Sequence, residues 1–275
     1  MSKCRNDPLV SDPVRLVVSD IDGTLVDGKK QLTPATIDAV AKLVAAGIGF
    51  TIISARPRSG MMPIAEALAI DAPMGAFNGG TIFHRDGSVL CHHLVDGAVA
   101  RAILDIAADF AVDRWVFADD RWYASTGQGK HVTSERIASD QAPVITADFA
   151  ALTDRTDKIT FVSDEPDVLS ELHDRIRQFD DRATIAQSQT YYLDITAPDA
   201  NKGVGIAALS EAIGVPLPAV LAIGDQANDL PMFARAGQSI AMGQGPEAVR
   251  AKAGWVTAGN DQDGVAQAIL ERILR

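Results

Sequence analysis

Cysteine, basic charge and long apolar runs are all scarce in this sequence, and each scarcity excludes a class of protein. Two cysteines, Cys4 and Cys91, provide neither a disulfide framework nor a thiolate metal site, which suits a reducing compartment. A formal net charge of -11 argues against a nucleic-acid partner, which would require a basic face. No apolar run reaches the roughly 20 residues that a membrane span requires, and residues 1–13 lack the apolar core of a signal peptide.

A dinucleotide-binding signature is missing as well. No Gly-x-Gly-x-x-Gly follows the first apolar segment, which disfavours a nucleotide-dependent oxidoreductase. The composition is otherwise that of an ordinary globular chain, with 47% hydrophobic and 22% charged residues. We expect a cytoplasmic protein and, at 275 residues, two domains rather than one. The acidic balance does not exclude an anionic substrate, because a local cation can invert the field of one cleft.

Apolar strands alternate with helical patterns up to residue 90 and again from residue 190. Apolar runs at residues 14–18, 48–53 and 219–223 have the composition of strands buried on both faces of a parallel sheet. Helices are expected between the strands, one opening at Thr33 and Pro34 and another over residues 63–69. This alternation predicts an α/β fold with a doubly wound, mostly parallel, Rossmann-like sheet.

The pattern changes between these two stretches. A helix is expected at residues 94–110, followed by a hairpin, a strand, a helix near residues 166–178 and an extended run over residues 183–195. This order is typical of an α+β domain rather than of βαβ units. We therefore expect a discontinuous core domain, formed by residues 1–90 and 190–275, with an inserted α+β domain at residues 91–189.

Two carboxylates end the first strand. Asp20 and Asp22 follow the apolar run directly, and residues i and i+2 of an extended segment point the same way. Ligands of open α/β sheets bind beyond the carboxyl ends of the strands, so both side chains are expected at the floor of a crevice. The alternative is a simple polar turn, since Asp and Gly are ordinary turn residues.

Three further clusters stand at strand ends or helix starts. Ser54 and Arg56 follow the second strand, where a hydroxyl and free backbone N–H groups can hold a phosphate, although Ser54 could simply cap the next helix. Lys202 opens a helix whose dipole opposes its charge, which favours a nearby anion, although such a lysine is usually solvated. Asp225 and Asp229 follow a buried strand, and Asp229 alone could be an ordinary first-turn acid.

If Asp20, Asp22 and Asp225 gather at one point, they favour a cation. Two unit charges about 4 Å apart repel by roughly 4 kcal/mol at an effective dielectric of 20. Such carboxylates raise one another's pKa values or bind a metal ion. Hard oxygen donors, without His or Cys beside them in the sequence, favour Mg²⁺ over Zn²⁺. Mg²⁺ commonly takes one or two carboxylates together with a substrate phosphate, which indicates phosphoryl chemistry.

Taken together, the clusters resemble the motif set of the haloacid dehalogenase (HAD) superfamily phosphatases, and the inserted segment resembles the α/β cap of the Cof-type subgroup. The motifs are Asp-Ile-Asp-Gly-Thr-Leu at residues 20–25, Ser-Ala-Arg at 54–56, Asn-Gly-Gly at 78–80, Asn-Lys-Gly at 201–203 and Gly-Asp-Gln-Ala-Asn-Asp at 224–229. The resemblance covers most of the chain. Two departures stand out: the second motif often reads Thr-Gly-Arg, and an acid or larger side chain often stands where this chain has Ala227.

The resemblance implies a role for each residue. Asp20 would attack phosphorus and form an aspartyl-phosphate, while Asp22 would protonate the leaving oxygen and then activate water. Mg²⁺ would be held by Asp20, the backbone carbonyl of Asp22, and Asp225. The remaining implied roles are phosphate binding by Ser54 and Lys202, substrate binding by Arg56 and Asn78, and support of the metal site by Asn228 and Asp229.

Substrate specificity is expected in the inserted domain, because a cap that closes over the crevice would exclude water. Its most chemically notable side chains are those of Arg114, Trp115, Trp122, Tyr123, Lys130 and His131. We expect the two tryptophans to be packing residues. At the domain junction, His92 and His93 are expected to be solvated linker residues.

The sequence therefore predicts a Mg²⁺-dependent phosphatase that acts on a small phosphorylated metabolite, such as a sugar phosphate. Two other interpretations stay open. A phosphomutase would share the aspartyl-phosphate but return the phosphoryl group to a sugar, and a non-catalytic protein on the same scaffold would only bind a phosphorylated metabolite. A dehalogenase is disfavoured, because its chemistry has no use for Asp22.

Overall fold

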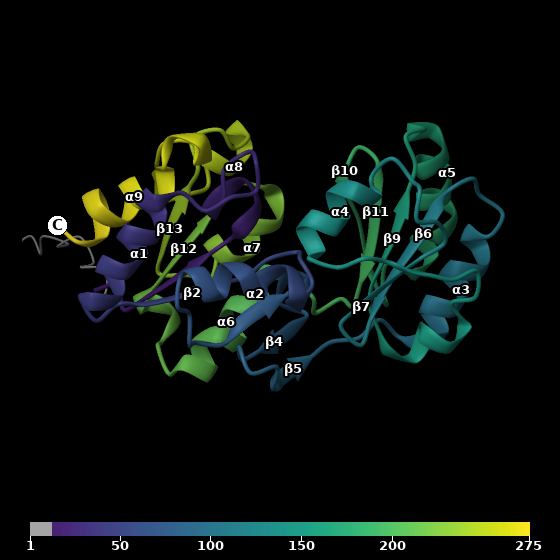
Figure 1. The fold of residues 1–275 in the computed structure, drawn as a ribbon, viewed down its shortest axis with the longest axis horizontal. Helices are drawn as coiled ribbons and strands as arrows, with labels where there is room; N and C mark the ends of the chain where they lie inside the picture. Colours follow the sequence, from purple (N-terminus) through teal and green to yellow (C-terminus); the bar gives the residue numbers. More distant parts are fainter. Residues whose placement is uncertain (1–12) are drawn as a thin grey trace, which may run out of the picture. The chain divides into compact units, whose positions relative to one another are not determined.

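The computed structural model describes residues 13–275, so Cys4 and the polar segment before residue 13 lie outside the described residues. The chain divides into two compact units (Figure 1). Unit 1 comprises the chain up to Ile52 together with Leu209–Arg275, and unit 2 comprises Ile53–Ala208. Among the described residues, no helix combines the length and the apolar character that crossing a bilayer requires.

A five-stranded sheet forms the centre of unit 1. The strand order is β14-β13-β12-β1-β2, and every neighbouring pair is parallel, which confirms the predicted doubly wound α/β fold. The strands are β1 (Leu16–Ser19), β2 (Gly49–Ile52), β12 (Val220–Gly224), β13 (Gln238–Ala241) and β14 (Trp255–Val256). Strand β1 lies between β12 and β2, and all four of its residues are buried, so both of its faces are covered, which explains its nearly continuous apolar sequence.

Helices alternate with the strands of unit 1, and one more follows the last strand. They are α1 (Pro34–Ala45), α6 (Lys202–Ile213, which begins in unit 2), α7 (Leu230–Phe233), α8 (Glu247–Arg250) and α9 (Gly264–Ala268). As predicted, Thr33 caps α1: its hydroxyl accepts from the Thr36 N–H at 3.2 Å, and Pro34 takes the first helical position. The same hydroxyl donates to Asp263 at 2.6 Å, which ties α1 to the start of α9.

Unit 2 contains two antiparallel sheets. The six-stranded sheet has the order β10-β11-β9-β6-β7-β8, with only its last pair parallel, and the three-stranded sheet has the order β3-β4-β5. The strands are β3 (Met74–Ala76), β4 (Thr81–Phe83), β5 (Val89–His92), β6 (Asp113–Ala118), β7 (Arg121–Ala124), β8 (Val144–Ile145), β9 (Thr156–Val162), β10 (Thr184–Gln189) and β11 (Tyr192–Thr196). The helices are α2 (Arg58–Ala67), α3 (Gly97–Ala107), α4 (Val132–Ser139) and α5 (Pro166–Ile176).

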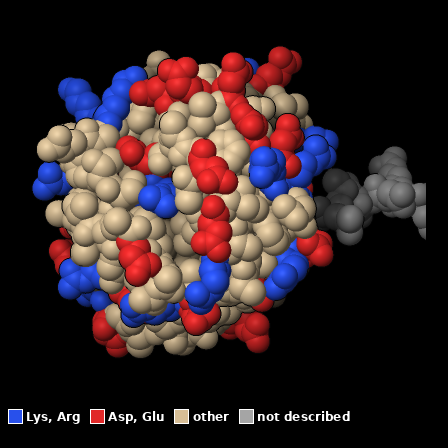
Figure 2. All heavy atoms as spheres, turned by 90° about the vertical axis from the view of Figure 1, so that its right-hand side faces the viewer, with Lys and Arg blue, Asp and Glu red and all other residues tan. Residues whose placement is uncertain are grey.

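Helices α3 and α5 pack on one face of the six-stranded sheet. Val116 of β6 belongs to this core, whereas Trp115 and Phe117 alternate to the opposite face. Trp115 and Trp122 are 1% and 0% exposed and meet edge to face with ring centroids 5.0 Å apart, so both are packing residues as predicted. Figure 2 shows the side of unit 2 that carries α3 and α5, where acidic and basic side chains are interspersed.

Three local expectations need correction. Helix α2 begins at Arg58 rather than at Pro63, which lies inside it. The run over residues 183–195 is not one extended strand but a hairpin of β10 and β11, and β11 continues to Thr196. His92 is exposed as predicted, but it is the last residue of β5 rather than part of a linker, and its Nε2 lies 2.6 Å from the buried carboxylate of Asp157. The predicted boundaries of the inserted domain, residues 91–189, remain a prediction.

A tight turn, Ile21–Leu25, follows β1 and requires glycine at its centre. Gly23 has φ +76°, and a Cβ at this position would stand 2.5 Å from Oδ2 of Asp225 and 3.0 Å from Oδ1. The turn therefore depends on the missing side chain twice, once for its backbone conformation and once for room beside a carboxylate.

Replacing Gly23 with Ala is expected to destabilise unit 1 more than replacing Gly47, the matched control. Gly47 has a similar φ of +81°, but no atom lies within 4 Å of the place where its Cβ would stand. Gly47→Ala should cost about 1 kcal/mol from backbone strain alone, and Gly23→Ala should add the collision with Asp225. Urea unfolding measures both free energies, and equal losses would contradict the crowding at Asp225.

Candidate active site

The register of the central sheet brings two acidic residues to the same edge. Ser19 pairs with Ile223, and the backbone N–H of Asp20 donates to the Ile223 carbonyl at 2.9 Å. Asp20 therefore stands level with Gly224, the last residue of β12 and the one that precedes Asp225. Because the strands are parallel neighbours, both side chains leave the sheet at its carboxyl edge, as the sequence predicts.

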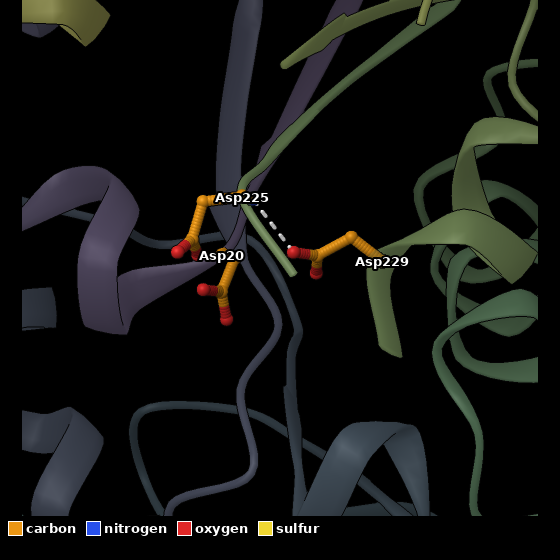
Figure 3. A group of neighbouring side chains, drawn as sticks. All are labelled: Asp20, Asp225 and Asp229. Atoms are coloured by element: carbon orange, nitrogen blue, oxygen red, sulfur yellow. Dashed lines mark hydrogen bonds between the residues drawn. The ribbon is translucent and has the colours of Figure 1, made fainter. Parts of the chain in front are cut away.

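Three carboxylates meet at this edge. Asp20, Asp225 and Asp229 each provide an oxygen, and these oxygens all lie within 4.8 Å of one another (Figure 3). The three residues are 5%, 3% and 0% exposed, so water screens their charges poorly. Gathering three ionised groups this closely is unfavourable unless protons or a cation neutralise them.

Backbone and side-chain donors fix the orientation of the group. Oδ2 of Asp229 accepts from the Asp225 N–H at 2.8 Å (Figure 3). It also accepts from the Gln226 N–H at 2.9 Å, as part of a capping box with Gln226. Asp225 accepts from the Thr24 hydroxyl at 3.1 Å and from the Gln226 amide at 3.0 Å. The alternative role of Asp229, an acid at a helix start, is thus also present, and it shapes the turn that carries Asp225.

The donor set fits a hard divalent cation. All three groups are buried carboxylates, the ligand type that Mg²⁺ prefers. Asp20 and Asp225 would supply oxygens to the ion. Asp229, which already accepts two backbone N–H groups, would support them from the adjoining turn.

Two other predicted residues of the metal site, Asp22 and Asn228, are not part of the three-carboxylate group. Asp22 stands in the turn after β1, and its half-buried carboxylate pairs with Lys30 rather than joining the three-carboxylate group. Only its backbone carbonyl is predicted to bind metal, and that role remains a prediction. Asn228 lies in the 3₁₀ turn Ala227–Asp229 and is exposed.

The four remaining candidates all lie in unit 2. Ser54 is 1% exposed, and its carbonyl accepts from the Asn78 N–H at 2.7 Å, which fastens the two motifs together. The Ser54 hydroxyl accepts from the Arg56 N–H at 3.2 Å, but it does not cap the next helix, because Pro57 is the N-cap residue of α2 and no side chain caps that helix. The Arg56 guanidinium is buried and donates to the Gly60 carbonyl at 3.0 Å. Substrate contact by Arg56 therefore remains a prediction.

Lys202 is brought to the same region by a contact between two glycines. A Cβ on Gly79 would stand 2.6 Å from the Cα of Gly205, so the Asn78–Gly79 turn lies directly against the first turn of α6. Lys202 is 1% exposed, and the alternative of a solvated lysine is therefore wrong. A buried ammonium group requires anionic or hydrogen-bonding partners, which favours an anion-binding role.

Sequence reasoning missed three contributors to the acidic edge. Thr24 donates to Asp225, Lys30 pairs with Asp22, and the Gln244 amide donates to the Gly23 carbonyl at 2.5 Å. Thr24 stands inside the first motif, so its hydroxyl was a visible signal. Lys30 and Gln244 carry no such signal, because their contacts depend on how loops fold back over the turn.

Known proteins are similar to this chain along nearly its whole length. A putative phosphatase of Haemophilus influenzae is 27% identical over 262 residues, which are 94% of this chain and 98% of the relative. The pyridoxal phosphate phosphatase YbhA of Escherichia coli is 26% identical over 269 residues, 94% of this chain and 99% of the relative. A crystal structure of a haloacid dehalogenase-like hydrolase from Bacteroides thetaiotaomicron has a TM-score of 0.86 at 26% identity, covering 93% of this chain and 98% of the other.

The family model for haloacid dehalogenase-like hydrolases matches residues 17–269. This range begins inside β1 and ends in the last helical segment, so it includes most of β1, all of β12 and all of unit 2. The chain belongs to the haloacid dehalogenase-like hydrolases.

Proposed function

We propose that this protein is a Mg²⁺-dependent phosphatase that hydrolyses a small phosphorylated metabolite through an aspartyl-phosphate on Asp20. The observation that carries the proposal is the buried group of Asp20, Asp225 and Asp229 at the carboxyl edge of a parallel sheet. The relatives support the reaction class, since one is named a putative phosphatase and another a pyridoxal phosphate phosphatase. A sugar phosphate is our first candidate substrate within this class.

In the first half of the reaction, a carboxylate oxygen of Asp20 attacks phosphorus. The bond from phosphorus to the leaving oxygen breaks, and Asp22 transfers a proton to that oxygen, so the product leaves as a neutral hydroxyl. Asp20 is suited to attack because it is held at the end of a rigid central strand. Asp22 is suited to proton transfer because it is partly exposed on the following turn.

In the second half, Asp22 removes a proton from water while the water oxygen attacks phosphorus. The bond from phosphorus to Asp20 breaks, which releases orthophosphate and regenerates the free Asp20 carboxylate. Lys30, which pairs with Asp22, stabilises the ionised carboxylate that this step requires. A base with a nearby ammonium group is therefore ready to act once the leaving group has gone.

The transferred phosphoryl group carries negative charge that fixed donors must stabilise. We assign this task to the Ser54 hydroxyl and the buried Lys202 ammonium, with Arg56 and Asn78 towards the rest of the substrate. Bound Mg²⁺ would add electrostatic stabilisation of the phosphate oxygens. Asp20, the Asp22 carbonyl and Asp225 are its proposed ligands, with Asn228 and Asp229 in support.

Asp20→Asn is expected to abolish orthophosphate release from 4-nitrophenyl phosphate and from a panel of phosphorylated sugars, nucleotides and cofactors. Asp22→Asn should lower kcat by about 10²–10⁴-fold, the range for loss of a general acid–base group. Asp38→Asn is the matched control, because Asp38 is an exposed acid on α1 that pairs with Lys42. Full activity in Asp20→Asn would contradict the assigned nucleophile, and an isomerised sugar phosphate without orthophosphate would indicate a phosphomutase.

Mg²⁺ is expected to raise the melting temperature of the wild-type protein. A ligand at 100 times its Kd stabilises a folded protein by about 2.7 kcal/mol, whereas EDTA should restore the original value. Asp225→Asn should lose this response and, without metal, should melt no lower than wild type, because one of three repelling charges is gone. Differential scanning calorimetry provides the measurement. An undiminished Mg²⁺ response in Asp225→Asn would refute the proposed metal ligand.

A further inference from the structure

The helix that follows the Ser54 segment lies in backbone contact with a helix of the six-stranded sheet region. Gly60 of α2 meets the end of α4: a Cβ at Gly60 would collide with the Ala138 carbonyl oxygen and stand 3.0 Å from the Cα of Ser139. Helices approach this closely only where a side chain is absent. The contact joins two parts of unit 2 that are about 80 residues apart in the chain.

A single glutamine, Gln141, links α2 to the turn between β6 and β7 beside this contact. The Gln141 amide nitrogen donates to the Ser59 hydroxyl at 2.6 Å and to the Asp120 carbonyl at 3.0 Å. Its amide oxygen accepts from the Trp122 N–H at 3.0 Å. Ser59 in turn donates to the Ser139 carbonyl at 2.5 Å. Both donors and the acceptor of the Gln141 side chain are thus engaged, with α2 on one side and the β6–β7 turn on the other.

An ion pair reinforces the same junction. Nε of Arg58 lies 3.3 Å from Oδ1 of Asp120, and another guanidinium nitrogen of Arg58 donates to the Gly87 carbonyl at 3.2 Å. Burial raises the pKa of the Asp120 carboxyl, and the Arg58 guanidinium opposes that shift. The first turn of α2 is therefore fastened to the β6–β7 turn of the six-stranded sheet by the hydrogen bonds of Gln141 and by the Arg58–Asp120 ion pair.

The first turn of α2 is in turn linked to Ser54, the proposed phosphate-binding residue, through Arg56. The Arg56 guanidinium donates to the Gly60 carbonyl, and the Arg56 N–H donates to the Ser54 hydroxyl. Displacement of the first turn of α2 would therefore move Arg56, whose backbone N–H orients the Ser54 hydroxyl.

We propose that Gln141 is a positioning residue, which acts through Ser59 and the first turn of α2 to hold Ser54 in its phosphate-binding position. The expected effect on kinetics rests on the proposed phosphatase function. The coupling between Gln141 and the Ser54 segment does not depend on that function. Gln141 need not touch the substrate, and its removal acts on phosphate binding rather than on the attack by Asp20.

Gln141→Ala tests the coupling, with Gln178→Ala as the matched control. Gln178 is an exposed glutamine of unit 2 whose amide donates to the Arg175 carbonyl. Hydrogen–deuterium exchange of residues 54–67 should become about fivefold faster in Gln141→Ala, because the one hydrogen bond from Gln141 to α2, at Ser59, is lost, and it should stay unchanged in the control. In the active enzyme, the KM for 4-nitrophenyl phosphate and the inhibition constant for orthophosphate should each rise about fivefold, with kcat nearly unchanged.

Ser59→Ala completes a double-mutant cycle. Because Ser59 is the link between Gln141 and α2, the effect of Gln141→Ala on KM should largely disappear in the Ser59→Ala background. Unchanged exchange in residues 54–67 would overturn the proposal, and so would equally faster exchange throughout unit 2, which would show a general loss of stability. A fall in kcat without a change in KM would also overturn it. If wild type released no orthophosphate, faster exchange confined to residues 54–67 would still support the coupling, and only the phosphatase assignment would fail.

Discussion

Repulsion among three buried carboxylates is the constraint on which the site depends. Asp20 and Asp225 are placed side by side by the register of β1 and β12, and Asp229 reaches them from the turn that follows β12. The sheet cannot relieve the repulsion by letting these groups drift apart, because its central strands are paired on both sides. The strands thus impose a concentration of negative charge that a bound cation would help to balance.

Much of the local structure can be understood as support for that imposed charge. Thr24 and Gln226 donate to Asp225, and two backbone N–H groups donate to Asp229. Gly23 leaves room where any side chain would strike the Asp225 carboxylate. These features do not neutralise the charge, but they fix where it lies, and electrostatic preorganisation of this kind is a major source of catalytic power in enzymes.

The sequence was informative where chemistry depends on strand ends. The buried run before Asp20 and the one before Asp225 both predict strands, and parallel neighbours necessarily present their next residues at one edge. It was less informative about α2, because Pro63 suggested a helix start although the helix begins five residues earlier at Arg58. It could not show that Lys202 is buried, since burial depends on contacts between segments distant in the chain, and the sequence does not reveal an approach such as that of Gly79 to Gly205.

The capping box of Asp229 has a consequence for how the metal site would be filled and emptied. Its hydrogen bonds to Asp225 and Gln226 are made by the protein alone, so the loop that bears Asp225 keeps its shape whether or not an ion is present. Loading then requires dehydration of the ion but little reordering of the backbone. Exchange of one divalent ion for another should accordingly be governed by the ions' own hydration shells rather than by a slow folding step in the loop.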